Sequence, residues 1–75
     1  MSVYQEITAL STPFLGPAAE QFITRQCTLH LRIEPAALAK QHLAELARCV
    51  EVAGVRYMVE TKAKELATRI AGFKA

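Results

Sequence analysis

The chain has 75 residues, a length that suits one domain and excludes a multidomain architecture. Apolar residues make up 52% of the chain and charged residues 21%, a mixture that excludes intrinsic disorder. The net charge of +2 comes from nine basic and seven acidic side chains that are interspersed along the sequence. This balance requires no polyanionic partner.

The composition favours helices over sheets. Alanine occurs 13 times and leucine 8 times, whereas glycine occurs three times and asparagine and aspartate are absent. Alanine and leucine are strong helix formers, and a hairpin-rich sheet would have almost no residues with which to turn. We therefore predict an all-α fold, a compact bundle of four or five short helices that forms a single domain over residues 1–75.

Two helices are predicted in the first half of the chain. The first carries an apolar stripe at helical spacing: Val3, Ile7, Leu10 and Phe14. Ser11 and Thr12 can cap a helix that starts at Pro13, and Gly16-Pro17 repeats this signal, so we expect a break or a sharp bend between about residues 11 and 17. The second helix should run from about 17 to 32 and bury one face: Ala19, Phe22, Ile23, Cys27, His30 and Leu31.

The second half begins with Pro35, which starts either one helix to Ala53 or a short turn at 35–39 followed by a longer helix. Gly54 should end this helix, whose stripe is Leu38, Ala39, Leu43, Leu46, Ala47, Val50 and Ala53. We also predict helix for the apolar run 55–59, because a lone strand would have no partner. Thr61 should cap a last helix that ends at Gly72 with Phe73 folded back, and its buried face is Ala63, Leu66, Ala67 and Ile70.

The sequence contains no candidate membrane span. Its longest uncharged run, 7–19, is broken by Pro13, Gly16 and Pro17, and a span needs ~20 apolar residues. The sequence also lacks a signal-peptide pattern. We therefore expect a cytoplasmic protein that does not associate with a membrane. Cys27 and Cys49 are then expected to be reduced and buried as small apolar residues, with a disulfide as the alternative.

A zinc site would have to use Cys27, His30, His42 and Cys49. His42 and Cys49 are seven residues apart, a rise of about 10 Å along a helix, so they cannot share one ion. His42 is also a poor match to the histidine of helical phosphotransfer domains, because Leu43-Ala44-Glu45 follows it. We predict no metal and no cofactor.

The sequence offers little for catalysis. Its two serines lie within the first 11 residues, aspartate is absent, and the glutamates occur at spacings typical of solvated helix faces. Two pairs at helical spacing, Glu45–Arg48 and Glu65–Arg69, are predicted to be surface ion pairs. We therefore predict that the protein is not an enzyme.

A small helical nucleic-acid-binding regulator is the alternative function. It would use the basic residues of the second half, Arg48, Arg56, Lys62, Lys64, Arg69 and Lys74. Four glutamates are interleaved with them and cancel much of their field: Glu45, Glu51, Glu60 and Glu65.

The preferred function is protein interaction. Several large apolar residues stand outside the regular stripes, and 75 residues have little room to bury them. We predict a non-enzymatic helical interaction module that forms a homodimer or binds another protein. Its partner-binding residues are expected to be Tyr4, Phe14, Tyr57, Met58 and Phe73.

Three short segments carry a family resemblance: LGPAA at 15–19, IEP at 33–35 and HLAELA at 42–47. Over roughly residues 11–71 the chain resembles small helical domains of prokaryotic regulatory proteins, whose role is unknown. The resemblance implies an all-helical regulatory module from a prokaryote. It carries over no catalytic or ligand-binding residue.

Overall fold

The computed structural model of the protein describes residues 2–73, and all the regular structure in that range is helical. The helical residues form three uninterrupted stretches of 29, 15 and 12 residues, which cover 3–31, 40–54 and 60–71. A separate 3-10 turn, η3, covers Pro35–Ala37. The predicted all-α class is confirmed. The predicted number of four or five helices is wrong within residues 2–73, because 3–31 contains no non-helical residue and 55–59 is not a helix.

Two of the three stretches combine several kinds of helix. The first is made of α1, the 3-10 turn η1, α2 and the π-helix η2, with the bounds Val3–Leu15, Gly16–Ala18, Ala19–Arg25 and Gln26–Leu31. The second begins as the 3-10 turn η4 and continues as α3, with the bounds Lys40–His42 and Leu43–Gly54. The third is α4, Glu60–Ala71.

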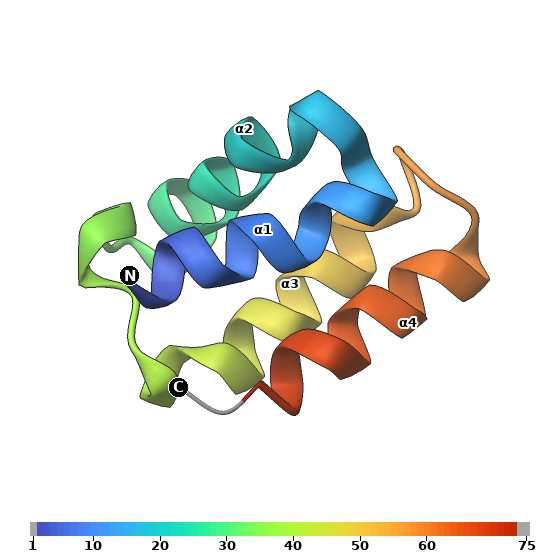
Figure 1. The fold of residues 1–75 in the computed structure, drawn as a ribbon. Coiled ribbons are helices and arrows are strands. Elements are labelled where there is room, and N and C mark those ends of the chain that lie inside the picture. The colour runs from blue at the N-terminus through green and yellow to red at the C-terminus, as the bar shows by residue number, and fades with distance from the viewer. Residues whose placement is uncertain (1, 74–75) are drawn as a thin grey trace.

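The chain folds into two helical hairpins that share one core (Figure 1). α1 is antiparallel to α2 and η2, and α3 is antiparallel to α4; α3 also contacts η2, and α1 contacts α4. The two stripes predicted for the second half of the chain supply most of the core. Its buried residues are Ile7, Phe22, Ile23, Cys27, Leu38, Leu43, Leu46, Ala47, Val50, Leu66, Ala67 and Ile70.

α1 begins at a capping box and does not break at Pro13. The Ser2 hydroxyl accepts a hydrogen bond from the Gln5 N–H at 3.1 Å, and the Gln5 side-chain oxygen accepts one from the Ser2 N–H at 3.0 Å. The Ser11 hydroxyl, expected to cap a new helix, donates instead to the Ile7 carbonyl at 2.8 Å within α1. The bend comes three residues after Pro13, at Gly16, whose φ of 60° favours glycine.

The π-helix η2 changes which side chains face the core. A π-helix bonds residue i to i+5, so it holds more residues in each turn than an α-helix. Cys27 is buried and Leu31 packs against the core, whereas His30 is exposed. The prediction that His30 faces the core is therefore wrong, because the wider turn moves Leu31 into that place. η2 ends at Arg32, whose φ of 56° and ψ of 42° are left-handed.

Residues 33–42 follow the second of the two predicted alternatives, a short turn and then a longer helix. Leu38 is buried after η3, and the backbone is extended at Ala39. The Ala39 N–H donates to His42 Nδ1 at 3.0 Å, so the imidazole stabilises the start of the second stretch. His42 thus has a structural role at a helix start.

The connection between α3 and α4 is a turn, not the predicted helix. The Gly54 carbonyl accepts hydrogen bonds from the N–H groups of both Tyr57 and Met58 at 2.9 Å, which ends α3. α4 then begins at Glu60 with Val59 as its N-cap, and no side chain caps it. Thr61 therefore lies inside the first turn, and the prediction that it caps α4 is wrong.

α3 and α4 lie close together at Gly54. A Cβ atom at this position would lie 3.1 Å from the Cβ of Ala63 and 3.3 Å from the Cε of Met58. Both distances are shorter than ordinary van der Waals contacts. A side chain at this position would require Ala63 or Met58 to shift by a few tenths of an ångström, so a glycine fits best where α3 ends against α4.

Substitution Gly54→Val should destabilise the fold, because the added methyl groups overlap Ala63 on α4. We expect the free energy of unfolding to fall by about 1–3 kcal/mol. Urea denaturation followed by circular dichroism measures it. Gly72→Ala is the matched control, since its Cβ would meet only the Thr68 carbonyl oxygen at 3.4 Å. If Gly54→Val were as stable as the native chain, the close approach of α3 and α4 at Gly54 would be contradicted.

Candidate functional site

The five residues predicted to bind a partner do not form one surface. Tyr4, Phe14, Met58 and Phe73 are partly buried and pack against the core, the first two from opposite ends of α1, Met58 from the α3–α4 connection and Phe73 from beyond α4. Tyr57 is the one member of the set that is largely exposed. Four of the five side chains therefore contribute to the core at different edges of the molecule, and Tyr57 belongs to a different group of residues, described below.

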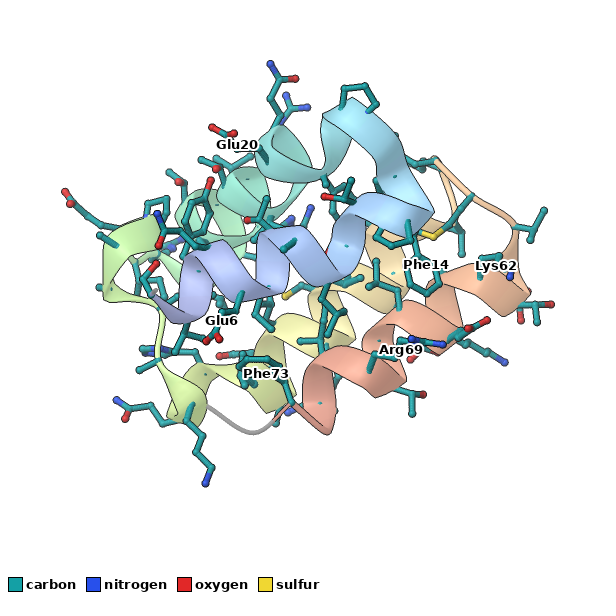
Figure 2. All side chains as sticks on the ribbon, viewed as in Figure 1. Glu6, Phe14, Glu20, Lys62, Arg69 and Phe73 are labelled. Atoms are coloured by element: carbon teal, nitrogen blue, oxygen red, sulfur yellow. The ribbon has the colours of Figure 1, made fainter. Side chains whose placement is uncertain are left out.

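Two of these aromatic residues have specific contacts. The Tyr4 hydroxyl forms a hydrogen bond of 2.6 Å with the Thr24 hydroxyl, which joins α1 to α2. The guanidinium of Arg69 lies over the ring of Phe14 at 5.6 Å from its centroid, a cation–π contact between α4 and α1 (Figure 2). Both contacts hold helices together.

The exposed apolar side chains lie elsewhere. Five large ones are at least half exposed, all on η2, α3 and the connection to α4: Leu29 (60%), Val52 (75%), Val55 (51%), Tyr57 (55%) and Val59 (68%). The predicted partner-binding residues included only Tyr57 of these five and not Leu29, Val52, Val55 or Val59. Val52 did carry a signal, because it is an apolar residue that lies off the core stripe of its own helix.

Val55, Tyr57 and Val59 form what we call the loop surface, on the α3–α4 connection. The backbone N–H groups of Arg56, Tyr57 and Met58 all donate to carbonyls at the end of α3. The ring of Tyr57 meets the ring of Phe22 edge-on, with centroids 5.3 Å apart and an interplanar angle of 77°. The loop surface therefore presents apolar side chains on a fixed backbone.

A groove lies between η2 and the second half of α3. One part of it, about 380 Å³, is lined by Arg25, Gln26, Leu29, His30, Val52, Ala53, Arg56 and Tyr57. A second part of about 280 Å³ shares three of these residues and is lined by His30, Arg48, Cys49, Val52 and Ala53. We call the two parts together the η2–α3 groove. Tyr57 stands where it meets the loop surface.

The charged side chains that line the groove are basic. Arg25, Arg48 and Arg56 line it, and no carboxylate lines it within the part of the chain that the structure describes. The predicted ion pair between Glu45 and Arg48 is not found among residues 2–73. Positive charge therefore surrounds an apolar centre.

The basic residues of α4 differ from these arginines, because each has an acidic partner. Lys64 lies 3.3 Å from Glu60, and Glu65 binds both Lys62 at 3.6 Å and Arg69 at 3.1 Å. The predicted Glu65–Arg69 pair is confirmed. The pairs neutralise much of the positive charge that the nucleic-acid hypothesis requires on α4. Lys74, also named in that hypothesis, lies outside the described residues.

The candidate metal ligands do not come together. Within residues 2–73 no three histidine, cysteine or acidic side chains are close enough to hold a metal ion. Cys27 is buried, His30 is exposed, and His42 Nδ1 accepts the Ala39 N–H. The hydroxyl groups of both serines are already hydrogen-bonded in α1. Ser2 caps the helix, and Ser11 donates to a backbone carbonyl.

Both cysteines are free thiols. Burial raises the pKa of Cys27, and the nearby Cys49 raises it further. Burial also raises the pKa of Cys49, with a further contribution from Glu45 that is opposed by Arg48. Thiols of this kind are poor nucleophiles at neutral pH, because the thiolate is the reactive form.

Comparisons with known proteins found no match to a protein-family model, a curated protein or a solved structure. The resemblance to helical regulatory domains stays a prediction. Among residues 2–73, each helix is too short or too polar to span a lipid bilayer.

The raised pKa of Cys27 predicts a loss of stability at alkaline pH. The folded state holds the thiol proton more tightly than the unfolded state, so this stabilisation is present below the ordinary thiol pKa and is lost as the pH rises above it. Under reducing conditions, the free energy of unfolding should be lower at about pH 10 than at neutral pH. The difference between the two pH values should be smaller for the variant Cys27→Ala. An equal fall in both proteins would contradict the assignment.

Proposed function

We propose that the protein is a non-enzymatic helical interaction module that self-associates through the loop surface. The observation that carries this proposal is an apolar connection between α3 and α4, with Val55, Tyr57 and Val59 at least half exposed. Loops at a protein surface are usually polar, and grouped apolar side chains mark interaction sites.

Val59 gives this proposal its strongest support. It is the N-cap of α4, a position where Ser, Thr, Asp or Asn is preferred and valine is among the least favourable residues. It is also 68% exposed, so it gains little from burial in the monomer. A residue that breaks a local rule without a gain within the chain points to a function outside it.

The rigidity of the loop also favours binding. The backbone N–H groups of Arg56, Tyr57 and Met58 are already paired, and the ring of Tyr57 packs against Phe22. Association then costs less conformational entropy than it would for a mobile loop. A second copy of the chain is a suitable partner, since a small core gains stability from dimer formation.

A standard interface needs about 800 Å² from each partner. The described residues of this chain expose 4790 Å² in total. A dimer of that kind would cover about one sixth of the surface. The loop surface would lie at its centre.

Substitution Val59→Asp should separate association from stability. In sedimentation velocity over micromolar to submillimolar concentrations, the native chain should form a dimer and Val59→Asp should remain a monomer. The aspartate can cap α4, so the monomer should gain about 1 kcal/mol in urea denaturation at low concentration.

Thr61→Asp is the matched control, because it adds the same charge two residues away at an exposed position in the first turn of α4. It should dimerise like the native chain. A native chain that stays monomeric over the whole range would remove the self-association proposal, and so would an undiminished dimer of Val59→Asp.

A nucleic-acid-binding regulator remains the second candidate, supported by Arg25, Arg48 and Arg56 around one groove. Retention of a single-stranded or duplex oligonucleotide at low salt, lost steeply as salt rises, would support it. The exposed Leu29 and Val52 between these arginines argue against it, because phosphates make no favourable contact with aliphatic side chains.

A further inference from the structure

We infer that the η2–α3 groove is a docking site for a short amphipathic helix of another protein, with an apolar face flanked by acidic residues. This inference rests on the proposed function only in taking the protein to be an interaction module. It uses a neighbouring surface that shares Tyr57 with the loop surface, and the experiments below separate the two.

The shape of the groove suits a helix. η2 and α3 are packed neighbours, and the groove runs between them. The ridge-and-groove surface of two packed helices accepts a third helix, as in helical bundles. Within residues 2–73 there is no strand edge to which an extended peptide could add.

The groove offers apolar contacts from both of the helices that border it. Leu29 projects from η2, and Val52 and Ala53 lie on α3. Val52 is the most exposed large apolar side chain of the described residues, although it sits in a well-formed helix. Apolar residues at i, i+3, i+4 and i+7 of a bound helix would cover these side chains.

The charges select an acidic partner. Arg48 lies in the second part of the groove, and Arg25 and Arg56 lie in the first part, so arginines accompany the apolar centre along its length. Glutamate or aspartate beside the apolar face of the ligand would pair with them. Such complementarity speeds association and excludes partners with basic flanks.

Two further features mark the same place. Gln26 lines the groove and is 3% exposed, and its side-chain oxygen has no hydrogen-bond partner. A buried acceptor left unpaired costs stability, and a donor from a ligand would satisfy it once the Gln26 amide turned toward the groove. The groove is also bordered by η2, and π-helical segments occur frequently at functional sites.

The same observations argue against a second copy as the occupant. In a two-fold dimer through this groove, the arginines of one copy would face the identical arginines of the other. Like charges brought together in this way are destabilising. A nucleic acid would pair with the arginines but would leave Leu29 and Val52 without apolar contacts.

The test uses two fluorescein-labelled peptides of about 16 residues, stapled as helices. Both carry leucine at i, i+3, i+4 and i+7, and the flanking positions are glutamate in one and lysine in the other. Fluorescence anisotropy with the full-length chain should show that the glutamate peptide binds at least tenfold more tightly than the lysine peptide. An oligonucleotide with the same net charge as the glutamate peptide should bind more weakly than that peptide.

Three variants locate the binding. Val52→Glu should weaken binding of the glutamate peptide at least tenfold. The double variant Arg25→Glu with Arg56→Glu should reverse the preference toward the lysine peptide. Lys40→Glu makes the same change of charge on η4, away from the groove, and should keep the affinity within about twofold. Circular dichroism verifies that each variant is folded.

Several outcomes would overturn the inference: no binding of the glutamate peptide at millimolar concentration, equal binding of both peptides, or unchanged binding by Val52→Glu. Tighter binding of the oligonucleotide would also overturn it. A dimer that Val52→Glu abolishes would assign the groove to a second copy. If Val59→Asp abolishes the dimer and leaves peptide binding unchanged, self-association uses the loop surface and peptide binding uses the η2–α3 groove.

Discussion

The close approach of α3 and α4 at Gly54 is the constraint on which the rest of the structure depends. It allows two short helices to bury a common face of leucine, valine, isoleucine and alanine side chains against α1, α2 and η2. It also leaves only five residues, 55–59, to reverse the chain direction. Three of their backbone N–H groups are used to end α3, and Val55, Tyr57 and Val59 are exposed while Met58 packs against the core.

The two proposed surfaces follow from this arrangement in different ways. The loop surface exists because the reversal is tight and its sequence is apolar. The η2–α3 groove exists because η2 and α3 bury one face each and keep Leu29 and Val52 on their outer faces. Neither surface needs a reactive group, and the serines and thiols of the described residues are held by hydrogen bonds or by burial.

Periodicity predicted the parts of the fold in which local pattern and burial agree. The stripes around Leu46 and Leu66 lie in the core because three- and four-residue spacing matches an α-helix. It failed at His30, because a π-helix has a different period and nothing in the composition signals one. The preference for threonine as an N-cap failed at Thr61, which lies two residues after the observed N-cap, Val59.

The candidate sites were harder to predict for a related reason. Large apolar residues such as Phe14 and Phe73 attract attention in a sequence, yet size favours burial, and both pack against the core. The exposed residues are smaller, and Val52 is revealed only by its position off a stripe. Likewise, Arg25 comes together with Arg48 and Arg56 only through the packing of two helices distant in sequence.

The π-helix has a consequence for how the chain tolerates changes in length. Six residues with the i+5 hydrogen-bond pattern accommodate one residue more than an ordinary helix would in the same axial distance. Deleting a single residue from Gln26–Leu31 would let the segment return to the α-helical register while Arg32 stayed near its present place. Such a shortened chain would keep its helical hairpin, and a deletion before Leu29 would change the direction in which Leu29 leaves the helix. Insertion or loss of one residue is thus a route by which related chains could gain or lose the groove without changing the fold.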